Sequence, residues 1–76
     1  MRNRIKKRIM NVLNINEEII NDDFSQGVCQ KWDSLRHLNL VIELEDEFDI
    51  SFEPEEIAEM INLVVIEKII GEKLNG

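Results

Sequence analysis

The chain of 76 residues is predicted to be all-α, a small four-helix bundle with a long loop between helices one and two and a short third helix. Apolar residues recur at helical spacing along most of the chain. Tyr is absent, Trp occurs once and Phe three times, a composition that favours helices over sheets. With 43% hydrophobic residues the chain is too apolar to be disordered, and its length suits one domain over residues 1–76.

The first helix is expected over residues 3–14, and Asn14 can end it in a left-handed conformation. Its apolar residues at helical spacing are Ile5, Ile9, Val12 and Leu13. From residue 15 to residue 33 the periodicity lapses into clustered Asn, Asp and Ser, which predicts a long loop anchored by Ile19 and Phe24. A loop of this length usually carries function.

Three further helices follow the loop. The second is expected over residues 34–48, with Asp33 or Ser34 capping its amino end. Pro54 suits the first turn of a short third helix over residues 54–60. Asn62 is expected to cap the fourth helix, and the residues that share its apolar face are Leu63, Ile66, Ile70 and Leu74.

The second helix has too many apolar residues for one stripe. At about 100° per residue, one set faces the bundle interior, namely Leu40, Val41, Leu44 and Phe48. A second set, Leu35, Leu38 and Ile42, lies well away from the first. Glu45, Asn39 and Asp46 flank this second set, as charged residues flank an exposed docking strip. Periodicity leaves open the alternative that the third helix or the loop covers the strip.

The net charge of −7 is unevenly distributed. Five of the nine basic residues lie in MRNRIKKR, whereas residues 37–67 hold ten carboxylates and neither Lys nor Arg. The acidic middle is expected to repel nucleic acid and to favour salt-sensitive encounters with basic protein surfaces; a solvated acidic face is the alternative. The basic end could contact a membrane or nucleic acid, although a solvated helix end is commoner.

The sequence also bears on location and on metal or nucleophile sites. No apolar run reaches membrane-spanning length, and the amino end is too interrupted by Asn for a signal peptide, so a cytoplasmic protein is expected. Cys29 is interpreted as a loop thiol and His37 as lining the mouth of the interior rather than acting as a base. The segment DEFDISFEPEE lacks the alternating ligands and central Gly of an EF-hand, so no metal site is predicted.

The segment DSLRHLNLVIELEDEFDI resembles the signature of acyl carrier proteins, which is Asp-Ser-Leu followed by a helix that ends in several carboxylates, Phe and Ile. The resemblance is strongest over residues 32–61, and WDSL is similar to free-standing carriers and peptidyl carrier domains of specialised pathways. Arg36 and Asn39 depart from the family, which usually has acidic residues there. Trp32 is also unusual, and we expect it to pack under the loop rather than touch a partner.

The resemblance implies that Ser34 accepts 4'-phosphopantetheine from coenzyme A through a separate phosphopantetheinyl transferase. The arm would carry acyl or aminoacyl groups as thioesters in fatty-acid, polyketide or related specialised biosynthesis, and the chain itself would not be an enzyme. Asp33 and Leu35 flank the attachment site, and Asp33 would help to dock the transferase. A serine at a helix start lies where backbone N–H groups and the dipole favour a phosphate, so Ser34 is expected to be both cap and attachment site.

The resemblance also assigns a docking surface for acyl- or aminoacyl-loading and condensing enzymes with basic patches. Its apolar strip is Leu35, Leu38 and Ile42, and its acidic rim is Glu43, Glu45, Asp46 and Glu47. The expected protein is a monomer with no nucleic-acid partner and no membrane span. The alternative is an unmodified acidic four-helix adaptor that binds basic proteins non-covalently. An intact Asp33-Ser34-Leu35 favours the carrier, because an adaptor has no need of it.

Overall fold

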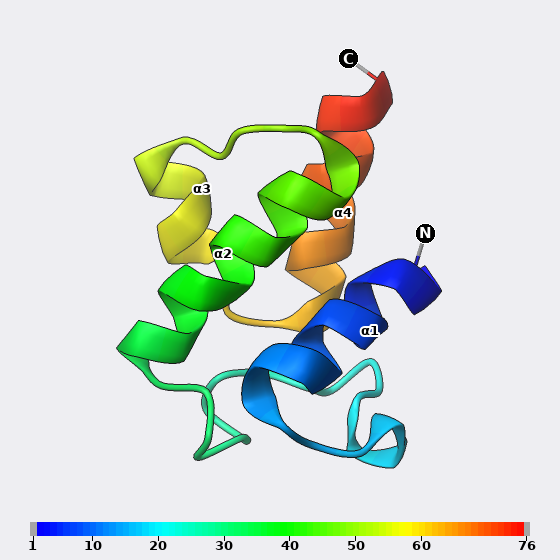
Figure 1. Cartoon of the computed structure of the whole chain (residues 1–76), viewed down its shortest axis with the longest axis vertical. Helices are drawn as coiled ribbons and strands as arrows, with labels where there is room; N and C mark the ends of the chain where they lie inside the picture. The colour runs from blue at the N-terminus through cyan, green and yellow to red at the C-terminus, as the bar shows by residue number, and fades with distance from the viewer. Residues whose placement is uncertain (1, 76) are drawn as a thin grey trace.

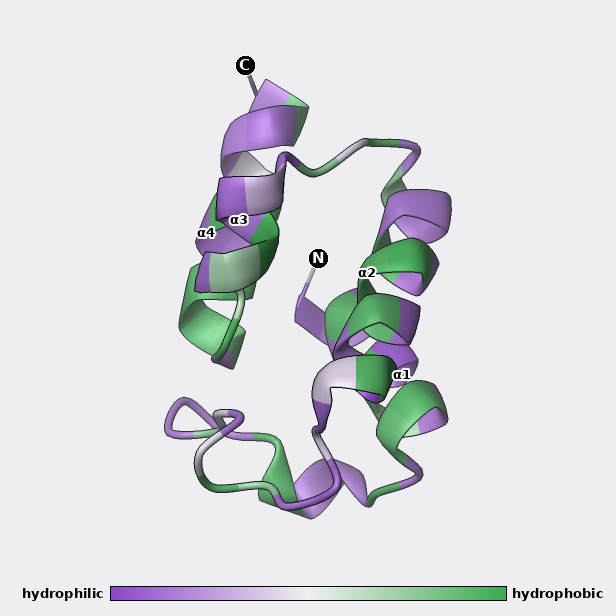
Figure 2. Cartoon of the chain, turned by 90° about the vertical axis from the view of Figure 1, so that its left-hand side faces the viewer, coloured by the Kyte–Doolittle hydropathy of each residue, from purple (hydrophilic) through white to green (hydrophobic). Residues whose placement is uncertain are grey.

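The computed structural model describes residues 2–75 and contains four α-helices and one 3-10 turn (Figure 1). The elements in chain order are α1 (Arg2–Leu13), η1 (Glu17–Ile19), α2 (Ser34–Phe48), α3 (Pro54–Glu59) and α4 (Leu63–Asn75). In place of strands, residues 2–75 have only an isolated antiparallel bridge, between Ser25 of the loop and Asn62. The predicted all-α bundle is therefore confirmed, and α1 and α2 form one layer of it, facing a second layer of α3 and α4 (Figure 2).

Local signals place the ends of α1 and α2. Asn14 follows α1 with a φ of 56°, the left-handed conformation expected there, and its N–H donates to the carbonyl of Met10 at 2.8 Å. Asp33 has an extended backbone, and its carboxylate accepts the N–H of Arg36 at 2.8 Å. Asp33 is therefore the cap of α2 and Ser34 its first helical residue, so the expectation that Ser34 is itself the cap was wrong.

α3 and α4 begin at the residues that the sequence predicts. Pro54 is the first residue of α3, and the N–H of Glu53 donates to the Glu56 carboxylate at 2.7 Å. Asn62 caps α4 as predicted, because its side-chain oxygen accepts the N–H of Val65 at 2.8 Å. Leu74, however, is 47% exposed and does not join the buried face of α4. The last turn of α4 projects beyond the other helices (Figure 1).

Apolar residues of α1, α2, α4 and the connecting segments meet in one core, and no polar or charged residue between 2 and 75 is buried in it. The buried residues from α1, α2 and α4 are Ile5, Ile9, Leu13, Leu40, Val41, Leu44, Phe48, Leu63, Ile66, Ile69 and Ile70. Those from the connecting segments are Ile20, Phe24, Cys29, Trp32, Phe52 and Met60. The core face predicted for α2 is therefore confirmed.

The long loop is anchored at Phe24 and Trp32, whose rings stack with their centroids 5.4 Å apart. Both side chains are 2% exposed, which confirms that Trp32 packs under the loop. The second expected anchor was wrong, because Ile19 is half exposed and its neighbour Ile20 is buried instead. Ile19 ends the 3-10 turn η1, and this turn directs Ile20 rather than Ile19 toward the core.

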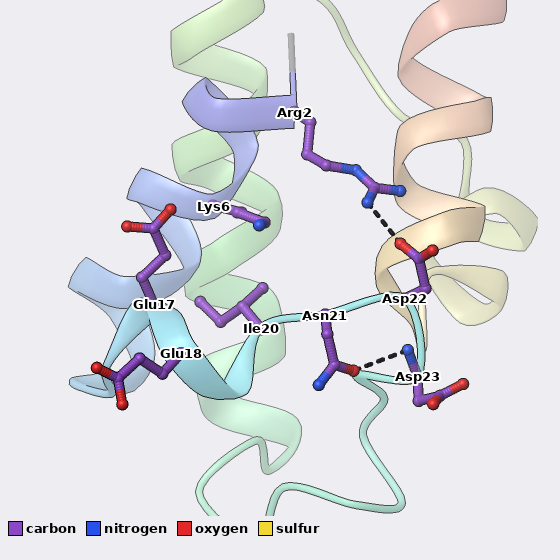
Figure 3. A pocket seen from close by; sticks show the side chains of 8 residues that line it. All are labelled: Arg2, Lys6, Glu17, Glu18, Ile20, Asn21, Asp22 and Asp23. Carbon is purple, nitrogen blue, oxygen red and sulfur yellow. Dashed lines mark hydrogen bonds and ion pairs between the residues drawn. The ribbon is translucent and has the colours of Figure 1, made fainter.

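Ion pairs tie the basic amino end to acidic residues far along the sequence. The Arg2 guanidinium binds Glu67 of α4 at 2.7 Å. It also binds Asp22 of the loop (Figure 3). The hydrogen bond to Glu67 and, to a smaller extent, the hydrogen bond to Asp22 hold the pKa of Arg2 above its ordinary value. Arg4 and Arg8 bind carboxylates of α2. The arginines of α1 thus form ion pairs with other elements, which the interpretation of this end as a solvated helix end did not predict.

No helix among residues 2–75 combines the length and the apolar character that a bilayer crossing requires.

Candidate functional site

Ser34 is the first residue of α2, at the point where the long loop enters this helix (Figure 1). The residue is exposed. Its neighbours Asp33 and Leu35 are exposed as well, so the whole Asp-Ser-Leu tripeptide can be reached from outside. The carboxylate of Asp33 is turned back onto the helix, where it accepts the N–H of Arg36. The Ser34 hydroxyl is therefore not needed as the cap and is presented at the positive end of the α2 dipole.

The loop that precedes Ser34 is held on several sides. The Arg36 guanidinium donates to the carbonyl of Lys31 at 3.0 Å, and the Lys31 ammonium donates to the carbonyl of Asn14 at 3.2 Å. The indole of Trp32 donates to the Nδ1 of His37 at 2.9 Å. Arg36 thus fixes the loop against α2. Its role could not be found from sequence spacing, because its partner is a backbone carbonyl.

His37 links the loop to α3 as well as to α2. Its Nε2 lies 2.7 Å from the carbonyl oxygen of Ile57. An indole N–H can only donate, so Nδ1 accepts from Trp32, and the ring proton on Nε2 is donated to Ile57. Both ring nitrogens are hydrogen-bonded to other groups, so neither is paired with the Ser34 hydroxyl. The geometry therefore does not form a serine–histidine nucleophilic pair.

A groove of about 370 Å³ begins at Ser34 and runs between α2 and α3. Its lining residues are Gln26, Ser34, His37, Leu38, Pro54, Ile57, Ala58 and Ile61. Most of these side chains are apolar and none carries a fixed charge. The groove can therefore accept an apolar group that is attached at or near Ser34.

The apolar strip of α2 is exposed along its length. Leu35 is 70% exposed, Leu38 54% and Ile42 61%. Neither α3 nor the loop covers them, so the alternative that this second face is buried is excluded. The two-faced character of α2 that its periodicity predicts is thereby confirmed.

The residues assigned to the acidic rim are not equivalent in the structure. Glu43 and Glu47 bind Arg8, and Glu47 also binds Arg4 at 2.7 Å. The hydrogen bond that Arg4 donates and, to a smaller extent, the one that Arg8 donates lower the pKa of Glu47. The hydrogen bonds that Arg8 donates to Glu43 and, to a smaller extent, to Glu47 raise the pKa of Arg8. These two carboxylates are therefore already bound within the chain.

The other two rim residues differ from each other. The carboxylate of Glu45 accepts the N–H of Phe52 at 2.8 Å and so supports the turn after α2. Asp46 is exposed and takes part in none of the ion pairs formed by residues 2–75. Of the four predicted rim residues, Asp46 is the one that offers its carboxylate freely to a partner.

Other chemistry has less support in the described part of the chain. No group of three or more His, Cys, Asp or Glu side chains between residues 2 and 75 is arranged to hold a metal ion. Cys29 is a free thiol that is 8% exposed and belongs to the core. A buried thiol among apolar side chains is poorly placed to act as a nucleophile.

Comparison with known proteins identifies no family. The sequence matches no protein-family model, and no curated protein matches it. The function must therefore be argued from the site itself.

Proposed function

We propose that this protein is an acyl carrier that accepts 4'-phosphopantetheine on Ser34 and delivers acyl or aminoacyl groups to partner enzymes. The observation that carries the proposal is the exposed Asp33-Ser34-Leu35 at the start of a helix whose outer face is apolar and uncovered. A hydroxyl in this position serves no purpose in the fold, because Asp33 already caps α2. Its exposure suits modification by another protein.

The residues around Ser34 fit a phosphodiester-linked arm. In the modification, the Ser34 oxygen forms a bond to phosphorus of coenzyme A, the pyrophosphate bond breaks, and the nucleotide leaves. The hydroxyl proton passes to a base that the transferase supplies, since His37 has both nitrogens in use. The amino end of α2 favours the negative phosphate that results. When bound, the arm supplies a thiol that carries the acyl group as a thioester.

The strip formed by Leu35, Leu38 and Ile42 supports the delivery part of the proposal. A partner that buries this strip would gain apolar contact beside Ser34, while the exposed carboxylates of Asp33 and Asp46 lie at its edges. Because Glu43 and Glu47 are bound to arginines of α1, we expect partners to recognise this face by apolar contact more than by charge. The groove between α2 and α3 could receive the apolar end of a cargo attached through Ser34.

The kind of biosynthetic pathway that the carrier would serve is a second, more specific proposal. Arg36 and Asn39 replace acidic residues that fatty-acid carriers usually have, which favours a specialised pathway over housekeeping fatty-acid synthesis. Arg36 has a structural role through Lys31, so its replacement alone would disturb the loop. Asn39→Glu is the cleaner change for restoring acidity, because Asn39 is exposed.

The experiment that tests the carrier is intact-mass analysis of the purified protein after incubation with coenzyme A, magnesium and a broad-specificity phosphopantetheinyl transferase. The wild type should gain one phosphopantetheine, and Ser34→Ala should gain none while keeping its helical circular dichroism. A free thiol should appear in the modified Cys29→Ser variant, whose only thiol would be that of the arm.

The adaptor alternative makes the opposite prediction in the same experiment. A wild type that stays unmodified with several active transferases would overturn the carrier and favour non-covalent binding of basic proteins. A Ser34→Ala variant that still gains the mass would show that the attachment site is elsewhere.

A further inference from the structure

The single Trp and the single His of the chain are bonded to each other at the entrance to α2. Trp32 closes the long loop, and its indole lies under that loop against Phe24. His37 is half-buried, lines the groove that begins at Ser34, and binds the carbonyl of Ile57 in α3. One imidazole therefore connects the loop, α2 and α3 beside the exposed serine.

This connection requires the neutral form of His37. The indole N–H of Trp32 needs an acceptor, and a neutral imidazole with its proton on Nε2 provides one at Nδ1. A protonated imidazole has N–H groups on both nitrogens, so it can still donate to Ile57 but can no longer accept from Trp32. Protonation would thus break the bond to the loop and keep the bond to α3.

Loss of this bond would leave the indole N–H without a partner. Trp32 is only 2% exposed, and a buried donor without an acceptor is unfavourable. The cost is relieved if residues 29–33 loosen and the indole reaches water. The segment that positions Asp33 and Ser34 would then lose order, while α3 stays attached to α2 through Ile57.

The charges around His37 are mixed. The other residues that line its groove are uncharged. Lys31 and Arg36 lie on the loop and on α2, and both are bound to backbone carbonyls. The carboxylate of Asp33 is bound to the N–H of Arg36, and that of Glu56 in α3 to Lys73 of α4. The remaining charged residues of the α3 segment are Glu53, Glu55 and Glu59.

We propose that His37 is a pH-sensitive positioning residue, which in its neutral form holds the loop before Ser34 through Trp32 and on protonation releases the loop but not α3. This role goes beyond the proposed carrier function and does not depend on it, because it concerns the unmodified chain.

The test follows the indole and imidazole nitrogen resonances of the unmodified protein by NMR from about pH 8 to 5. Each resonance is unambiguous, because the chain has one Trp and one His. We expect the indole N–H resonance of Trp32 to shift in step with protonation of His37. The heteronuclear NOE of residues 29–33 should fall over the same range, and that of α3 should not.

His37→Gln is the matched control, because a Gln amide can accept from Trp32 and donate to Ile57 without titrating. In this variant the indole resonance and the loop order should stay constant over the same pH range. His37→Leu, which can make neither bond, should show a loosened loop at every pH.

Several results would overturn the proposal. One is an indole resonance that stays fixed while His37 titrates, and another is a loss of order in α3 rather than in residues 29–33. A His37→Gln variant that titrates like the wild type would also contradict it. If that variant does not fold, the wild-type titration decides alone, since no other His or Trp contributes to it.

Discussion

Residues 34–42 and residues 43–48 form one continuous helix, α2, but their outward-facing side chains differ in what they contact. In the first segment Leu35, Leu38 and Ile42 are exposed apolar residues without cover. In the second segment Glu43 and Glu47 are bound by Arg8 and Arg4 of α1. The first half of α2 is thus free to meet another molecule, whereas the second half attaches the helix to the rest of the bundle.

Arg4 shows how closely the second half is tied to α1. Its guanidinium binds both the carboxylate and the carbonyl of Glu47, and it lies 4.5 Å from the centroid of the Phe48 ring. An acidic residue on a surface helix is therefore not by itself a docking residue. What distinguishes Asp46 from Glu43 and Glu47 is the presence or absence of an arginine from a neighbouring helix.

The largest expected effect comes from shortening a core residue of α2. Leu44→Ala should lower the free energy of unfolding by about 2–5 kcal/mol, because Leu44 is fully buried and its loss leaves a cavity. Leu38→Ala is the matched change on the exposed face and should alter the free energy by no more than about 0.5 kcal/mol. Urea denaturation of both variants measures the difference. Equal losses would show that the exposed strip is structurally required.

Removal of the cap at the start of α2 should have the next largest effect. Asp33→Ala should cost about 0.5–2 kcal/mol, because the N–H of Arg36 loses its acceptor. Ser34→Ala should cost less, since Ser34 is the first helical residue and not the cap. The comparison is made by thermal and urea unfolding. A greater loss for Ser34→Ala would mean that the serine has a structural role in this half.

The ion pairs of the second half can be removed through Arg8. Arg8→Ala should lower the melting temperature, and more at low than at high salt, because salt screens partly exposed ion pairs. Lys7→Ala is the control, since Lys7 is exposed and forms none of the ion pairs found among residues 2–75. Scanning calorimetry at two salt concentrations gives the readout. If Arg8→Ala behaved like Lys7→Ala, Glu43 and Glu47 would be available to partners after all.

Acid should weaken the same contact. The hydrogen bonds that Arg4 and, to a smaller extent, Arg8 donate lower the folded-state pKa of Glu47. The contribution of Glu47 to the free energy of unfolding is therefore complete above the unfolded-state pKa, about 4.3 for Glu. That contribution is lost as the pH falls through the lower, folded-state pKa. Urea unfolding of the wild type between about pH 6 and 3 should therefore show falling stability with a smaller slope in Glu47→Gln. An unchanged slope in the variant would argue against this pair.

The smallest effect on stability is expected in the exposed strip, where function should change instead. Ile42→Ala should leave the melting temperature almost unchanged, because Ile42 is 61% exposed, and should reduce cargo transfer by partner enzymes. Val64→Ala in α4 is a control of similar exposure on another face. Transfer of a radiolabelled acyl group is the measurement. Equal transfer by both variants would remove the strip from the docking surface.

The charge of the docking face is tested by Asp46→Lys in the same transfer assay. This change should slow association at low salt and leave the fold intact, since Asp46 is the free carboxylate among the predicted rim residues. Glu72→Lys, an exposed acid of α4, is its control. If both changes had the same effect, net charge rather than this position would govern association.

The order of residues was enough to predict the four helices and the two faces of α2. The signals that set them act over a few residues: the Asp33 cap, Pro54 at the start of α3, the Asn62 cap and the left-handed Asn14. Even the two errors in burial, at Ile19 and Leu74, concern single residues rather than whole elements. Hydrogen bonds and periodicity within a turn or two can be derived from the order of residues alone. For this reason the predicted bounds of α2, residues 34–48, agree with those in the structure.

Which polar side chains stay free of partners within the chain depends on how the helices pack, and the sequence did not predict it. Arg4 and Arg8 meet Glu47 and Glu43 across 43 and 35 residues of sequence, and His37 meets Ile57 across 20. No local signal predicts such pairs, because they exist only once α1 and α3 are packed beside α2. The positions of Ser34 and of the exposed strip follow from the sequence, but the loss of Glu43 and Glu47 as free charges follows from helix packing.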